Sequence, residues 1–158
     1  MHKSLVFPLL CFLGIFIVSC GGSDDPTPSP QKNPEQEALE ELTGGSNITW
    51  TTANGGSVTK DGSPVTADYS GFELRLTSTA SNRTYTTTPN PVFDQSGNWS
   101  FAGGNFDKMQ FTGSQPAAGR EISFSRNGDK LTLNFSVPMP NGRVSALAGS
   151  YIFELVKK

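Results

Sequence analysis

Residues 131–137 read Leu131-Thr132-Leu133-Asn134-Phe135-Ser136-Val137, and this stretch decides the fold. Its apolar side chains recur at every second position, with polar side chains between them. Successive side chains of a β-strand point to opposite faces, so the pattern predicts a strand with one face buried and one face in water.

The same alternation recurs along the chain from Asn47 onward. The polar positions are mostly Thr, Ser, Arg and Glu, which suit an exposed strand face. We therefore expect about eight strands. The apolar members of the other runs are Phe72, Leu74 and Leu76; Trp99 and Phe101; Met109 and Phe111; Ile122 and Phe124; and Tyr151, Phe153 and Leu155.

Short turn signals separate these runs. They are Lys60-Asp61-Gly62, Ser96-Gly97-Asn98, Arg126-Asn127-Gly128-Asp129 and Asn141-Gly142-Arg143. Asn-Gly and Asp-Gly tolerate the positive φ angles of tight hairpins. Short connections favour pairing between strands that are neighbours in sequence. The sequence therefore predicts an all-β fold, an antiparallel meander closed into a barrel, with a β-sandwich as the alternative.

Residues 34–43 predict a short helix in front of the strands. Asn33 can cap it, Pro34 suits its first position, and Thr43-Gly44-Gly45 ends it. Leu39 and Leu42 share one face. Two apolar residues cannot hold so short a helix in water, so we expect it to dock on the β-domain or to fray.

Residues 1–19 follow the plan of a secretory signal peptide. His2 and Lys3 give a short positive start, and an apolar run extends over residues 5–18. A transmembrane helix needs about 20 apolar residues, so the run is too short to span a membrane comfortably. It suits the apolar region of a signal peptide.

The end of this run, Ile17-Val18-Ser19-Cys20-Gly21, resembles the lipobox of bacterial lipoproteins. The resemblance implies cleavage before Cys20 and attachment of lipid to its sulfur, with an ordinary secretory signal as the alternative. Cys11 would leave with the signal peptide. The mature chain would then use its one cysteine for the anchor and would contain no disulfide.

Residues 20–33 predict a disordered tether, because prolines and small polar residues dominate it. Within it, Ser23-Asp24-Asp25 resembles the acidic export signal of surface-exposed lipoproteins of the Bacteroidetes. The resemblance implies an outer-membrane location, anchored by lipid, with display at the cell surface as the extension of that hypothesis.

The order of landmarks over residues 44–158 resembles the small lipocalin-like lipoproteins of the Bacteroidetes. The landmarks run Leu42-Thr43-Gly44-Gly45, Trp50, Asp61-Gly62, Ser70-Gly71-Phe72-Glu73-Leu74, Tyr85-Thr86-Thr87, Gly97-Asn98-Trp99-Ser100-Phe101, Leu131-Thr132-Leu133-Asn134-Phe135 and Gly149-Ser150-Tyr151-Ile152-Phe153-Glu154-Leu155. The resemblance implies a lipocalin-like β-barrel in which Trp50 plugs one end. It supplies no catalytic residues.

The residue types argue against catalysis, cofactors and metals. The only histidine is His2, within the signal peptide, which excludes histidine-based acid–base chemistry and most zinc sites. The remaining candidates are carboxylates on expected turns and polar strand faces, and these do not form a metal-binding motif. No basic stripe is present, so nucleic acid is a poor partner. The carboxylates are Asp61, Asp68, Glu73, Asp94, Asp107, Glu121, Asp129 and Glu154.

Two binding functions follow, and both leave the chain without enzymatic activity. The first is a barrel that holds a small apolar or amphipathic ligand in its interior. The second is a filled domain that contacts glycan or a partner outer-membrane protein. Tyr69 and Tyr85 are weak candidates for ligand contact, because they lie beside polar stretches. Arg75, Arg83 and Arg120 are expected to point to water. An interior packed by Phe72, Phe101, Phe111, Phe124, Phe135 and Phe153 would argue against the first function.

Overall fold

The structure is a computed structural model that describes residues 31–139 and 146–158. Within it, Lys32–Lys158 form one compact unit. The predicted signal peptide, Cys20, nearly all of the predicted tether and the expected turn at Asn141-Gly142 lie outside the described residues.

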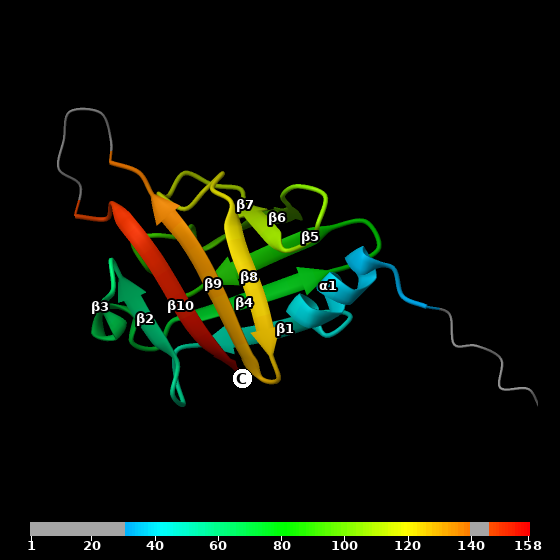
Figure 1. The fold of residues 1–158 in the computed structure, drawn as a ribbon, viewed down its shortest axis with the longest axis horizontal. Helices are drawn as coiled ribbons and strands as arrows, with labels where there is room; N and C mark the ends of the chain where they lie inside the picture. Colours follow the sequence, from blue (N-terminus) through cyan, green and yellow to red (C-terminus); the bar gives the residue numbers. More distant parts are fainter. Residues whose placement is uncertain (1–30, 140–145) are drawn as a thin grey trace, which may run out of the picture. The chain divides into compact units, whose positions relative to one another are not determined.

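Eight antiparallel strands close into a barrel (Figure 1). They pair in the order β1-β4-β5-β6-β7-β8-β9-β10, and β10 pairs back onto β1 through Trp50 with Lys157 and Thr51 with Val156. The predicted all-β barrel is therefore confirmed. The strands are β1 (Asn47–Thr51), β4 (Glu73–Ser78), β5 (Arg83–Thr87), β6 (Ser96–Phe101), β7 (Lys108–Phe111), β8 (Ile122–Asn127), β9 (Lys130–Val137) and β10 (Gly149–Lys157).

Two further strands extend the sheet beside β10. β2 (Ser57–Lys60) pairs with residues 151–154 of β10, on the same edge that β1 uses further along. β3 (Ser63–Pro64) pairs with β2, and the short 3-10 helix η1 (Thr66–Tyr69) follows it. β1 and β2 thus share one edge of β10.

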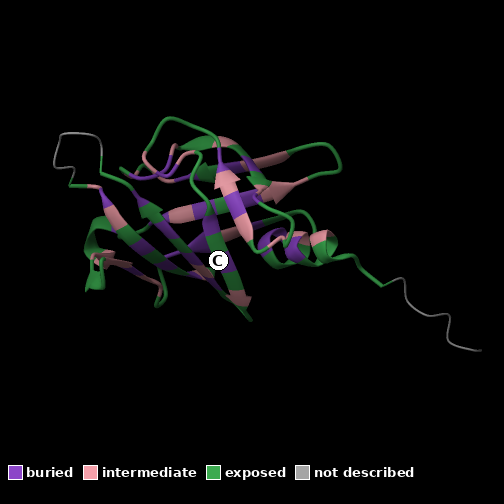
Figure 2. Ribbon diagram, turned by 45° about the horizontal axis from the view of Figure 1, so that its top comes forward, coloured by how far each residue is buried: buried purple, intermediate pink, exposed green. Residues whose placement is uncertain are grey.

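Buried and exposed residues alternate along the strands, as Figure 2 shows. On β9, the four apolar residues of the quoted stretch are buried, while Asn134 and Ser136 are exposed. The apolar residues predicted to face inward are buried on the other strands too, with one exception. Phe101 is only half-buried, at the end of β6.

Two of the predicted turns are confirmed, and one is wrong. Asp61 and Gly62 adopt φ angles of 49° and 78° between β2 and β3, and Gly128 adopts 61° between β8 and β9. Ser96-Gly97-Asn98 instead lies within β6. Gly97 serves packing, because a Cβ there would lie 2.8 Å from Cε1 of Tyr85, whose ring crosses it.

The predicted helix is present as α1 (Pro34–Thr43). Asn33 caps it, accepting from the Gln36 amide at 2.8 Å, while the Gln36 side chain accepts from the Asn33 amide. Gly44 ends it in the left-handed conformation. Leu42 is fully buried and Leu39 half-buried, so the helix docks on the domain, which is the first of the two expected alternatives.

Candidate functional site

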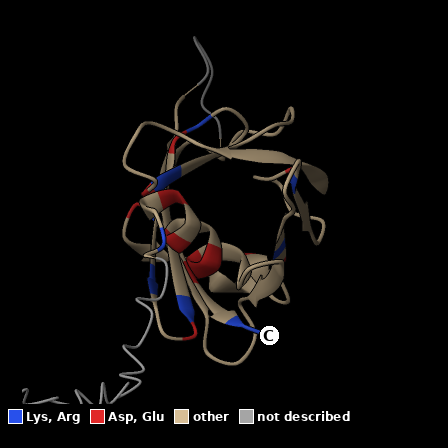
Figure 3. Cartoon of the chain, turned by 90° about the vertical axis from the view of Figure 1, so that its right-hand side faces the viewer, with Lys and Arg blue, Asp and Glu red and all other residues tan. Residues whose placement is uncertain are grey.

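Helix α1 covers one end of the barrel, where β5 begins. Figure 3 looks onto this end, with the helix in front of the barrel opening. Trp50 is fully buried beneath it, and its indole Nε1 donates to the Leu42 carbonyl oxygen at 3.1 Å. Because the indole N–H group has a hydrogen-bond partner, its burial leaves no unsatisfied donor. Trp50 therefore plugs this end together with α1, as the sequence resemblance implied.

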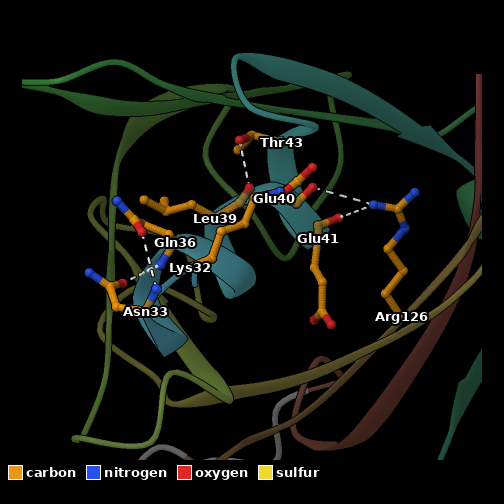
Figure 4. Close-up of polar contacts among 8 residues, drawn as sticks. All are labelled: Lys32, Asn33, Gln36, Leu39, Glu40, Glu41, Thr43 and Arg126. Atoms are coloured by element: carbon orange, nitrogen blue, oxygen red, sulfur yellow. Dashed lines mark hydrogen bonds and ion pairs between the residues drawn. The ribbon is translucent and has the colours of Figure 1, made fainter. Parts of the chain in front are cut away.

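Arg126 holds the C-terminal end of α1. Its Nη1 donates to the carbonyl oxygens of Glu41 at 3.0 Å and Glu40 at 3.3 Å (Figure 4). The Glu40 carbonyl also accepts from the Gly44 amide at 2.8 Å. Both carbonyls lie at the negative end of the helix dipole, which a guanidinium stabilises. The same guanidinium lies 5.6 Å from the centroid of the Trp50 ring, within cation–π range.

Arg83 makes a second contact between α1 and the barrel. Its guanidinium lies 4.9 Å from the Phe101 ring centroid and 5.5 Å from that of Trp99, and it pairs with the Glu35 carboxylate. The prediction that Arg83 points to water is therefore wrong, because the aromatic pair on the neighbouring strand gives it a better environment. Arg75 and Arg120 are exposed, as predicted.

The connection between β5 and β6 closes the opposite end of the barrel. We call residues 88–95 the plug turn. Val92 and Phe93 within it are 0% and 2% exposed. The Phe93 ring centroid lies 5.3–5.9 Å from four other rings, those of Phe72, Phe111, Phe135 and Phe153. Phe93 thus lies at the centre of a ring of phenyl groups contributed by different sides of the barrel.

Local hydrogen bonds shape the plug turn. The Asn90 carboxamide oxygen accepts from the amides of Phe93 at 2.7 Å and Val92 at 3.0 Å. Its nitrogen donates to the Thr88 carbonyl oxygen at 2.9 Å and to Thr87 Oγ1 at 3.1 Å. Asn side chains commonly organise turns in this way.

Asp94 fastens the plug turn to the loop between β7 and β8. Its carboxylate accepts from the amides of Ser114 and Gln115, each at 2.9 Å, and from the Ser114 hydroxyl at 3.1 Å. Partial burial of the carboxylate acts to raise its pKa, but these hydrogen bonds together outweigh it and lower the pKa. Gly113 is required here, because a Cβ would lie 2.0 Å from Asp94 Oδ2.

The interior is filled by aromatic side chains. Of the six phenylalanines predicted to pack it, five are buried: Phe72, Phe111, Phe124, Phe135 and Phe153. Sequence reasoning missed Phe93, which occupies their centre. The neighbouring Asn90 and Pro91 read as a turn, and two adjacent apolar residues show no strand periodicity.

Tyr69 and Tyr85 are not available at the surface. Their exposed fractions are 5% and 1%, so both rings belong to the core although they lie beside polar stretches of the sequence. Burial raises the pKa of Tyr85 to about 12, and the nearby Asp94 charge adds to the rise. Burial also raises the pKa of Tyr69, with a further contribution from Tyr151. Stacking of either ring on an external glycan would require the core to open.

Several of the candidate carboxylates have partners on the barrel surface. Glu73 pairs with Lys158, Glu121 pairs with Lys108, and Asp61 accepts from the Ser150 amide. Among the residues that the structure describes, no group of three or more His, Cys, Asp or Glu side chains could hold a metal ion. In the same part of the chain, no helix is both long and apolar enough to cross a membrane.

The outer face of β1, β4, β5 and β6 is polar. Cross-strand register brings Thr49, Arg75, Thr86 and Ser96 into one row. A shallow groove of about 300 Å³ lies beside this row, lined by Thr49, Glu73, Arg75 and Thr86–Thr88. Large apolar residues exposed on the described surface are limited to Met139 and Ile152, so this surface shows no broad apolar patch.

Comparison of the chain with protein-family models, with curated proteins and with solved structures finds no match in any of the three.

Proposed function

We propose that the chain is an exported lipoprotein, anchored by lipid on Cys20 in the outer membrane, whose β-barrel acts as a non-enzymatic interaction domain. The anchor is supported by the segment Ile17-Val18-Ser19-Cys20-Gly21 and by the apolar run before it. Ser23-Asp24-Asp25 extends the proposal to display at the cell surface.

The observation that carries the interaction role is the filled barrel. Helix α1 and Trp50 close one end, while Phe93 occupies the centre and the plug turn closes the other end. A small barrel is either filled by its own side chains or holds one small ligand. Aromatic side chains fill the interior of this barrel. We therefore expect a partner to bind the outer, polar surface.

This surface suits a partner that is rich in hydroxyl groups or otherwise polar. The groove beside Arg75 offers threonine hydroxyls, one guanidinium and one carboxylate, without an exposed aromatic platform among its lining residues. A glycan or a polar face of an outer-membrane protein suits these groups. Arg75→Ala should weaken capture of such a partner, and Arg120→Ala, at another exposed site, is the matched control.

The anchor is tested by labelling cells with a fatty-acid probe. Wild-type protein should incorporate the label, and Cys20→Ala should lose it. Cys11→Ala is the matched control, because it removes the other cysteine and should remain labelled. Label retained by Cys20→Ala, with unchanged fractionation into membranes, would contradict the proposal.

An interior ligand, small and apolar or amphipathic, is the second candidate. One observation favours it: the central ring, Phe93, belongs to a connection between strands and not to a strand. Native mass spectrometry of the purified protein separates the two candidates. A filled interaction domain should show the mass of the protein alone, whereas a carrier should retain a small molecule of defined mass.

A further inference from the structure

The plug turn is attached to the molecule differently on its two sides. At its base, hydrogen bonds join it to Thr87 and, through Thr88, to Glu73 of β4. Further along, they run to the loop 114–117, including the Ala117 amide, which donates to the Val92 carbonyl oxygen at 3.0 Å. Toward the interior, Phe93 makes ring contacts. The turn is thus held by hydrogen bonds at its edges and by the ring contacts of Phe93 at its centre.

The barrel ladder closes without the plug turn. β5 pairs with β6 through Thr84–Asn98, Tyr85–Gly97 and Thr86–Ser96, and a further bond from the Thr87 amide to the Gln95 carbonyl oxygen closes the base of the turn at 2.8 Å. Thr88 continues the pairing of β5 with β4, because its amide donates to the Glu73 carbonyl oxygen at 3.1 Å. Movement of residues 89–94 therefore breaks no strand pairing. Local openings of this kind cost less free energy than global unfolding and occur in contiguous units.

We propose that the plug turn is a hinged unit. When it opens, its hydrogen bonds to residues 114–117 break, while the eight-stranded ladder stays closed. Opening withdraws Phe93 from the centre and exposes the four phenyl groups around it, which gives the interior a route to solvent. Asp94 is the latch of this unit, because its carboxylate joins the turn to the loop by three hydrogen bonds. The inference is independent of the lipid anchor, so the two can fail separately.

Hydrogen exchange resolved by residue, on the full mature protein in detergent, tests the proposal. The reporting amides are those of Gln115 and Ala117 in the facing loop, because their acceptors lie on the plug turn. They should exchange at least ~100-fold faster than the ladder amides of Leu133 and Phe153, with little dependence on low urea concentrations. Equal rates with equal urea dependence would overturn the proposal, because the turn would then open only on global unfolding.

Two matched variants test the latch without removing Phe93. Asp94→Asn leaves the turn in place but weakens its attachment, so exchange at Ala117 should rise ~10-fold while the ladder amides stay unchanged. Asp61→Asn is the control, since Asp61 accepts from the Ser150 amide at 2.8 Å outside the plug turn. Equal acceleration throughout the Asp94→Asn barrel, or no acceleration at Ala117, would contradict the assignment of Asp94 as the latch.

Discussion

Individual side chains of this barrel reach across to neighbouring strands and fill space that the paired backbones leave between them. The Tyr85 ring passes over Gly97 on the next strand, and its hydroxyl donates to the Thr112 carbonyl oxygen at 2.7 Å. The ring occupies the place of a side chain at residue 97, and its polar end is satisfied. Gly97 is thus a packing residue, and its small size matters more than its backbone freedom.

Gly97→Ala should destabilise the protein by about 1–3 kcal/mol, as overpacking does in well-packed cores. The added Cβ would lie 2.8 Å from the Tyr85 ring and 2.9 Å from the Thr112 carbonyl oxygen. Urea unfolding followed by tryptophan fluorescence measures the change. Gly104→Ala is the control, because a Cβ there meets nothing within 4 Å. Equal midpoints for the two variants would refute the packing role.

Asp94 should make the stability of the protein depend on acidity. Its pKa is lowered on folding, so its stabilising contribution is present above the unfolded pKa, near 4, and is lost as pH falls through the folded value. Asp94→Asn should cost about 1 kcal/mol at pH 7, since the carboxylate is partly exposed. The difference from wild type should shrink toward pH 2.

Chemical denaturation at both pH values measures this difference. Asp68→Asn, an exposed substitution in η1, controls for the loss of one negative charge. A gap between wild type and Asp94→Asn that stays constant from pH 7 to pH 2 would show that ionisation of Asp94 does not stabilise the fold.

Helix α1 acts as a small element that depends on the barrel beneath it. Its capping box and its left-handed Gly44 define its ends, but only Ala38, Leu42 and Thr43 are buried along it. A helix this short is marginal in water, so its stability comes from contact with Trp50, Arg83 and Arg126.

The two leucines of α1 should therefore differ in effect. Leu42→Ala removes a fully buried side chain and should cost about 2–5 kcal/mol, whereas Leu39→Ala, at a half-buried position, should cost about 1 kcal/mol. Thermal unfolding of both variants measures the contrast. If the two values were equal, or if Leu39→Ala cost more, α1 would not dock through Leu42.

Elements with a local signal could be predicted from sequence, and elements defined by closure could not. The alternation in β9 and the caps of α1 are local, so both were found. Burial of Phe93 depends on Phe72 and on the rings of β7, β9 and β10 that surround it, which no local pattern reports. Gly97 was misread for the same reason, because its requirement comes from a residue on another strand.

At the scale of the molecule, the compact unit is a barrel closed at both ends. α1 and Trp50 cover one end, the plug turn covers the other, and a polar outer face lies between them. This architecture places the candidate contacts outside the barrel and makes access to its interior depend on the plug turn. The proposed lipid anchor would attach the unit through the tether that precedes α1.

The lipid anchor is the central claim, and the mass of the N-terminal peptide tests it most directly. The protein should be isolated from membranes of a bacterium that processes lipoproteins, and its mature N-terminus should be analysed by mass spectrometry. We predict a chain that begins at Cys20 and carries a diacylglycerol group on the cysteine sulfur. A chain that begins at another residue, or an unmodified Cys20 thiol, would contradict the account.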